Sequence, residues 1–205
     1  VENASFYTER TYVSGIAKGN TTLDSAKALG VDENYLSTCG YQIYQGRGFV
    51  ESDFSKIHKV VLLDDTAVLT LFPNESPVGK TIEIMGEPFT VVGVIKKSDS
   101  FQPVINSRED YYTYNQESYP LVLMPDVCWP IVFRYDEPEN AVVMAKTTED
   151  MSTVGKTTAE IMNEAVTNTS DSLAYKAEDL LEKAKSLQEL GQSTNQQLIW
   201  IASIS

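Results

Sequence analysis

The sequence predicts an α+β fold in which short strands outnumber helices. The clearest signal lies in residues 59–97, where an apolar run, a short amphipathic stretch, an alternating run and a second apolar run follow one another. That order predicts one strand, one helix and two further strands. Residues 148–166 have apolar side chains at helical spacing and predict another helix. Helices and hairpin-like strands in separate runs are typical of the α+β class.

The N-terminal part of the chain predicts a β-hairpin and a short helix. Residues 3–18 are rich in aromatic and β-branched side chains, and Gly19 and Asn20 give a turn signal. Residues 21–31 then run back as the second arm of the hairpin. Residues 32–40 begin with acidic side chains and end with glycine, which indicates a short helix.

Residues 59–97 define the most regular part of the chain. The expected elements are a strand at 59–63, a helix that Asp64 or Asp65 caps and that ends at Phe72, and strands at 81–85 and 89–97. The last of these strands is almost wholly apolar, so we expect it to be buried on both faces.

The C-terminal half predicts further strands and a long terminal helix. Strands are expected at 121–125, 129–135, 141–146 and 173–178, and helices at 148–166 and 179–205. The long helix ends in an apolar run from Ile199 to Ile204 that contains a tryptophan. This run is either the start of a transmembrane helix or the end of an amphipathic helix that packs on its own domain.

The charge of the chain excludes one class of partner. The 205 residues contain 29 acidic and 16 basic side chains, which gives a net charge of −13. Nucleic acid requires a basic surface, so we expect no nucleic acid partner. The same acidity argues against a flat contact with an anionic membrane.

The motif Gly79-Lys80-Thr81 resembles the end of a phosphate-binding loop. That loop needs a glycine five residues before Gly79, where this sequence has Asn74, and it needs a helix afterwards. A β-branched strand pattern follows instead. We therefore expect a turn and no nucleotide site here, and the second such motif, at 155–157, lies inside a helical pattern.

Catalytic and metal-binding patterns are missing from the sequence. The single histidine, His58, lies between charged residues before an apolar run and is expected to be an exposed turn residue. No nucleophile motif accompanies it. The acid pairs at 64–65 and 109–110 are interpreted as caps or solvated side chains. We therefore predict no enzyme activity, no cofactor and no metal site.

Two cysteines and a tyrosine-rich segment remain as candidate features. Cys39 and Cys128 belong to no metal-binding motif, so they either form one disulfide or are separate buried apolar residues. The segment 98–120 is either an ordinary excursion or a contact surface, because tyrosine gives contact area at low entropic cost. Its tyrosines are Tyr111, Tyr112, Tyr114 and Tyr119.

Several short sequence patterns follow one another in an order that resembles a known family. They are Val31 to Leu36, then Gly46, Arg47, Phe49 and Asp53, then Val60, Val61 and Leu71 to Pro73, and finally Pro77, Gly79, Lys80, Ile82, Ile84, Gly86, Phe89, Val91, Gly93 and Val94. In this order they resemble the MacB-like periplasmic core domain of ABC transporter permeases, in the superfamily that includes MacB, LolC/LolE and FtsX. The resemblance covers about residues 30–205, and 98–180 match only in outline.

The resemblance implies a fold of two lobes. One is a porter-like α/β lobe built from both ends of the chain, residues 1–46 and 119–205, with the C-terminal helix running into a membrane span. The other, residues 47–118, is an inserted and mostly β lobe.

The resemblance also implies a function on the outer face of a bacterial cell membrane, periplasmic or extracellular. The domain would do no chemistry and would couple cytoplasmic ATP hydrolysis to the export or extraction of a substrate by moving. Its implied partners are a cognate cytoplasmic ATPase, a homodimer mate or paired permease, and an extracytoplasmic adaptor or lipoprotein. The alternatives are an extracytoplasmic ligand-binding or sensor domain of a membrane receptor, and a secreted hydrolase.

Overall fold

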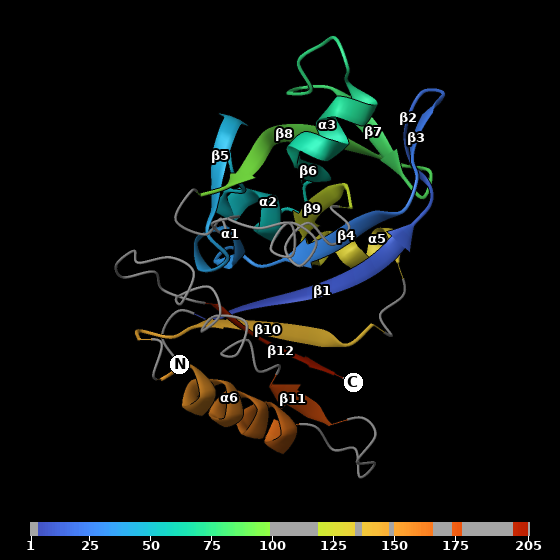
Figure 1. Ribbon diagram of the computed structural model, residues 1–205. Helices are drawn as coiled ribbons and strands as arrows, with labels where there is room; N and C mark the ends of the chain where they lie inside the picture. The colour runs from blue at the N-terminus through green and yellow to red at the C-terminus, as the bar shows by residue number, and fades with distance from the viewer. Residues whose placement is uncertain are drawn as a thin grey trace, which may run out of the picture.

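The computed structural model describes residues 4–98, 119–133, 137–147, 150–165, 174–177 and 199–204. Strands dominate, with short helices between them (Figure 1). The strands are β1 (Ala4–Val13), β2 (Ile16–Lys18), β3 (Thr21–Leu23), β4 (Ala26–Val31), β5 (Tyr41–Gly46), β6 (Val60–Leu63), β7 (Thr81–Ile84), β8 (Glu87–Lys97), β9 (Leu121–Pro125), β10 (Glu139–Met144), β11 (Tyr175–Ala177) and β12 (Ile199–Ile204). The helices are α1 (Tyr35–Thr38), α2 (Glu51–Ser55), α3 (Asp65–Leu71), the 3₁₀ turn η2 (Asp126–Cys128), α5 (Trp129–Val132) and α6 (Met151–Ala165).

All the described strands belong to one mixed sheet. Their order is β11-β12-β10-β1-β4-β9-β6-β8-β7-β2-β3, and β5 pairs with the C-terminal half of β8. The β4–β9 and β6–β8 pairs are parallel, and the other pairs are antiparallel. In Figure 1 the sheet runs from β7 and the β2–β3 hairpin at one end to α6 and β11 at the other.

The central strands are buried on both faces. In β6, Val61 and Leu63 join one apolar cluster and Leu62 joins the other. Successive side chains of a strand point to opposite faces, so the two clusters lie on opposite sides of the sheet. The apolar runs of β6, β8 and β9 are therefore continuous because each face has its own core. The first cluster is completed by α3 and α5, and the second by α1.

Two glycines allow β5 to cross close to β8. A Cβ on Gly46 would lie 2.3 Å from the backbone oxygen of Val92, and a Cβ on Gly93 would lie 2.3 Å from the oxygen of Arg47. Gly46 also has a φ of +75°, which L side chains rarely adopt. Gly48 differs, since its nearest contact would be 3.5 Å away. The close approach of backbone atoms therefore requires glycine at positions 46 and 93 but not at position 48.

Most of the predicted elements are confirmed. The hairpin around Gly19 and Asn20 is the β2–β3 pair, and its longer arms are β1 and β4. The helix ending near Gly40 is α1. Asp64 caps α3 by accepting a hydrogen bond from the Ala67 amide, at 2.8 Å. The predicted helix at 148–166 is α6.

Two predicted elements are wrong. Residues 129–132 form helix α5, preceded by η2, where a strand at 129–135 was expected. Pro130 occupies the first turn of α5, a position where the missing amide hydrogen costs nothing. Residues 199–204 form strand β12, which pairs with β10, where the end of a helix over 179–205 was expected. The β-branched residues of this run favour a strand. Residues 178–198 lie outside the described residues.

The division into lobes at residues 1–46, 47–118 and 119–205 stays a prediction. In the described part of the chain no helix is both long enough and apolar enough to span a bilayer.

Candidate functional site

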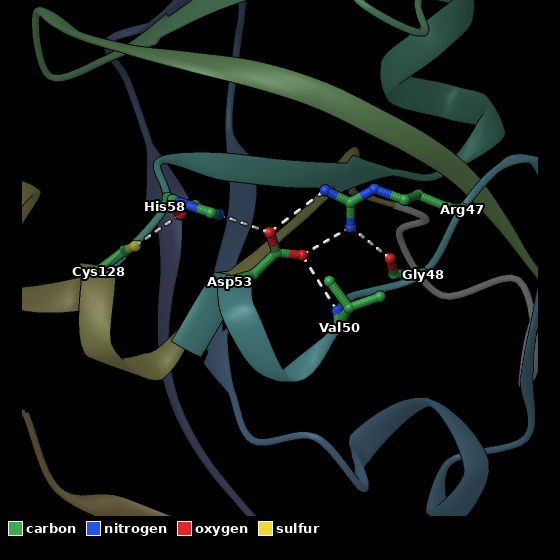
Figure 2. Close-up of polar contacts among 6 residues, drawn as sticks. All are labelled: Arg47, Gly48, Val50, Asp53, His58 and Cys128. Carbon is green, nitrogen blue, oxygen red and sulfur yellow. Dashed lines mark hydrogen bonds and ion pairs between the residues drawn. The ribbon is translucent and has the colours of Figure 1, made fainter. Parts of the chain in front are cut away.

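A polar cluster lies in the connection between β5 and β6, which contains helix α2 (Figure 2). Arg47 follows β5 directly, Asp53 lies in the first turn of α2, and His58 precedes β6. The acidic residues Glu51 and Asp53 in that first turn favour the helix, because carboxylates are stabilised near a helix N-terminus. The local sequence thus brings an arginine, an aspartate and a histidine to one place.

The carboxylate of Asp53 is the centre of this cluster. Its side chain is fully buried, whereas Arg47 and His58 are 45% and 46% exposed. Arg47 donates from Nη1 to Oδ2 at 2.6 Å and from Nη2 to Oδ1 at 3.2 Å. The Val50 amide donates to Oδ2 at 3.1 Å, and Nδ1 of His58 lies 3.1 Å from Oδ1. Every lone-pair direction of the buried carboxylate therefore has a partner (Figure 2).

The electrostatics of the cluster favour an ionised aspartate. Burial acts to raise the pKa of Asp53, but the hydrogen bonds from Arg47, Val50 and His58 outweigh it, so the pKa is lowered. A carboxyl group of this kind accepts hydrogen bonds at neutral pH and is a poor proton donor. We interpret the cluster as a clamp that fixes the 47–58 segment to the sheet.

Cys128 adds a thiol to this cluster but does not complete a catalytic triad. Its Sγ donates to the backbone oxygen of His58 at 3.3 Å, and the imidazole ring points to Asp53 instead (Figure 2). Burial, with the charges of Asp126 and Asp53, raises the pKa of Cys128 to about 11. A neutral and fully buried thiol is a poor nucleophile.

Cys39 and Cys128 are both free and buried in the structure, which favours the buried apolar alternative over the disulfide. Cys39 packs in the cluster that contains Tyr35, and Cys128 packs in the cluster on the other face of the sheet. The sheet therefore separates them. Burial raises the pKa of Cys39 to about 12.

Only one of the four predicted contact tyrosines can be placed. Tyr119 donates from its hydroxyl to that of Tyr12 at 3.2 Å, and the two rings meet edge to face at 5.2 Å. Tyr12 is 64% exposed. Tyr111, Tyr112 and Tyr114, like the acid pair at 109–110, lie outside the described residues. Their role as a contact surface stays a prediction.

The other sequence motifs fall where they were expected. Gly79, with a φ of +82°, forms the turn before β7, and Lys80 is an exposed residue 3.5 Å from the carboxylate of Glu75. The second such motif lies inside α6. His58 is exposed, as predicted. The contact of His58 with the buried Asp53 was not predicted, because an aspartate among other acidic residues is expected to be exposed to solvent. Among the described residues, no group of three or more potential ligands could hold a metal ion.

The fold and this site define a sheet-dominated domain in which the cluster around the buried Asp53 holds backbone in place. Residues 1–161 match the family of the MacB-like periplasmic core domain. The chain belongs to this family, and the resemblance inferred from the sequence is confirmed.

Individual relatives agree with this assignment. An uncharacterised ABC transporter permease, YvrN, from Bacillus subtilis is 29% identical over 186 residues, which are 90% of this chain and 44% of the relative. A macrolide export ATP-binding/permease protein, MacB, from Aggregatibacter actinomycetemcomitans is 39% identical over 89 residues, which are 43% of this chain and 14% of the relative. The chain thus spans less than half the length of these relatives.

Solved structures show the same fold. The extracellular domain of the transporter YknZ from Gram-positive bacteria matches with a TM-score of 0.59 and 17% identity, over 80% of this chain and 76% of that one. The periplasmic region of MacB from Actinobacillus actinomycetemcomitans matches with a TM-score of 0.59 and 22% identity, over 80% and 67%. The protein therefore contains a MacB-like domain of an ABC transporter permease with the expected α+β fold.

Proposed function

We propose that this domain lies on the outer side of the cell membrane and couples ATP hydrolysis, by a cytoplasmic ATPase, to the export or extraction of a substrate. The observation that carries the proposal is the family match over residues 1–161. In addition, the described residues offer no activated nucleophile and no metal cluster. The domain itself would then be non-catalytic and would act by movement and by contact.

In this proposal the whole domain moves together with its dimer mate, and it comprises the two proposed lobes, residues 1–46 with 119–205 and the inserted residues 47–118. A homodimer mate or paired permease would supply the opposing domain, and an adaptor or lipoprotein would contact the outer surface. Tyr111, Tyr112, Tyr114 and Tyr119 are proposed contacts. Relatives named as macrolide exporters make macrolides a reasonable first substrate to test.

The test is a comparison of ATP hydrolysis with transport in the full permease and its ATPase, reconstituted in vesicles. Replacing this domain by a flexible glycine-serine linker should leave basal ATP hydrolysis and abolish uptake of macrolides or peptides into inside-out vesicles. Transport at the unmodified rate without the domain would overturn the proposal. That result would favour the sensor alternative, in which the domain detects a ligand and transport does not need it.

The tyrosine contact is tested by alanine substitution of the four tyrosines in the same vesicles. Loss of substrate-stimulated ATP hydrolysis, with basal hydrolysis intact, is the expected result. Unchanged stimulation would remove these tyrosines from the proposed surface.

A further inference from the structure

A hollow lined by apolar side chains and by two acidic ones, its acidic rim, lies beside η2, the turn that also carries Cys128 of the Asp53 cluster. It has a volume of about 340 Å³ and is formed by β1, η2, α5 and the start of β10. Phe6, Val127 and Trp129 form its apolar part, and Asp126 and Glu139 form its acidic part. In Figure 1 these elements meet where β1 passes α5 in the middle of the molecule.

The apolar part of the hollow has a rigid base. The indole nitrogen of Trp129 donates to Oε2 of Glu137 at 3.1 Å, and Glu137 also pairs with Arg10. The ring of Phe133 lies 4.4 Å from that of Trp129, and the Arg10 guanidinium lies over the Phe133 ring at 4.7 Å. Trp129 is thus held on several sides before any ligand arrives. Trp129 is itself only 3% exposed, so it forms a fixed support for the more exposed Phe6 and Val127.

The acidic part has no compensating cation in the part of the chain that the structure describes. The lining contains no lysine or arginine, and neither Asp126 nor Glu139 forms an ion pair there. Burial raises the pKa of both carboxyl groups, and the charges of neighbouring acids raise it further. Asp32 is one such neighbour of both, but hydrogen bonds from Ser5 and the Phe6 amide already satisfy its carboxylate.

The hydroxyl group of Thr8 is a second group in the hollow that lacks a partner in the part of the chain that the structure describes. Thr8 lines the hollow, and its Oγ1 is buried without a hydrogen-bond partner among the described residues. Buried hydroxyl groups are normally paired, so the described lining of the hollow contains an unpaired polar atom in addition to its two acidic side chains.

We propose that this hollow receives a segment of a partner protein that presents a lysine or arginine beside apolar side chains. The acidic rim suits the cation, and the Phe6–Trp129 wall suits its apolar neighbours. A protein is favoured as the occupant because exposed apolar side chains stand beside the acidic ones. Phe6 and Val127 in the lining are 42% and 36% exposed, and Ile131 of α5 is 40% exposed. The inference gives a location and a chemistry to the partner contact in the proposed function, and it rests on that function.

The test uses the 205-residue chain and a peptide with alternating leucine and arginine around one phenylalanine, labelled with an uncharged dye. Fluorescence anisotropy should show saturable binding that weakens as salt is added. The double variant Asp126→Asn with Glu139→Gln should weaken binding about fivefold or more, which is the loss expected for two partly exposed charge pairs. Both amides keep the shape of the side chains and remove mutual repulsion, so this variant should fold.

The matched control removes two negative charges elsewhere, in Asp24→Asn with Glu83→Gln. Both side chains are exposed and lie in the β3–β4 turn and in β7. This control should bind like the unmodified chain. Equal weakening in both double variants would overturn the proposal, because net charge alone would then explain binding. A second variant, Val127→Lys, puts a cation at the rim and should abolish binding, and unchanged binding would contradict the proposal.

Two further comparisons restrict the occupant. A peptide with glutamate in place of arginine should not bind, and N-acetyl-arginine amide should bind far more weakly than the basic peptide. Equal affinity for the arginine amide would overturn the choice of a protein segment. These measurements involve neither ATP nor transport. The proposal for the hollow can therefore be overturned without overturning the proposed function, and the reverse is also true.

Discussion

Arg47 holds the buried carboxylate of Asp53 in two parallel hydrogen bonds, of 2.6 and 3.2 Å. This paired geometry is specific to arginine, because a lysine ammonium cannot present two donors in one plane. The contact closes the segment between β5 and β6 over residues 47–58. The contact therefore gives a structural reason for the Arg47 and Asp53 pattern, one that does not depend on the resemblance to a family.

Asp53→Ala should destabilise the chain by about 3 kcal/mol, because it removes a buried charge that satisfies several donors. The free energy of unfolding in urea measures this. A double-mutant cycle with Arg47→Ala should show a coupling of about 1–3 kcal/mol. The exposed Asp24→Asn variant is the control and should change stability by less than about 0.5 kcal/mol. Additive effects of the Arg47 and Asp53 substitutions would contradict the pairing.

The same pair predicts the acid response of the chain. The folded pKa of Asp53 is below its ordinary value of 3.8, so its stabilising effect is complete above that pH. The effect is lost as the pH falls through the folded pKa. Unfolding measured from pH 5 downward should therefore be steeper in the unmodified chain than in Asp53→Ala.

Asp64 should have the opposite pH dependence. Burial raises the pKa of Asp64 to about 6. The hydrogen bonds that its carboxylate accepts from the Ala67 and Leu121 amides lower the pKa but do not outweigh burial. Its contribution to stability is therefore greatest below pH 3.8 and is lost as the pH rises through about 6. Asp64→Asn keeps the acceptor oxygen and should gain stability relative to the unmodified chain between pH 4 and pH 7.

Thermal unfolding at pH 4 and pH 7 measures the stability of the Asp64→Asn variant relative to the unmodified chain. The Asp65→Asn variant, at the next residue, is the control for the loss of one negative charge. An Asp64→Asn variant with the same relative stability at both pH values would show that Asp64 does not titrate in this range.

The two thiols should be unreactive in the folded protein. Burial raises the pKa of Cys39 to about 12 and that of Cys128 to about 11, so the reactive thiolate is scarce at pH 8. Iodoacetamide should label both cysteines rapidly in urea and slowly without it, as mass spectrometry of peptides would show. An oxidised Cys39–Cys128 peptide from the native protein would contradict the separate burial described above.

Gly93→Ala should destabilise the chain by about 3 kcal/mol or more, because the new methyl group would meet the backbone oxygens of Arg47 and Gln45 at 2.3 and 3.0 Å. Gly48→Ala is the matched control and should be close to neutral, since its nearest neighbour would be 3.5 Å away. Urea unfolding of the two variants gives the comparison. Equal stability would mean that β5 and β8 are farther apart than the structure has them.

The sequence predicts best where local pattern and tertiary burial agree. Residues 59–97 form the expected elements because each apolar run is bounded by a cap, a proline or a glycine and is buried as a strand or a helix face. The helix at 129–132 was missed because Trp129, Ile131 and Val132 favour a strand by composition. The packing of Trp129 against Phe133, and its bond to Glu137, are tertiary contacts that no local pattern contains.

The site was harder to predict than the fold. The pattern Gly46, Arg47 and Asp53 could be found in the sequence, but the burial of Asp53 depends on the path of the chain back to His58. The hollow was not found at all. Its acidic residues, Asp126 and Glu139, come from separate elements and meet only because β1 lies between β4 and β10.

The pairing of β4 with β9 and of β1 with β10 has a consequence for how the molecule is made. Lys27 is in register with Leu121, and Ala4 is in register with Val143. Strands β1 and β4 are therefore synthesised before β10 and β9, and these edges stay unpaired until residues 121–144 have been made. Folding of such a topology is expected to be slow and to follow synthesis rather than accompany it, since loop closure must precede most of the stabilising contacts.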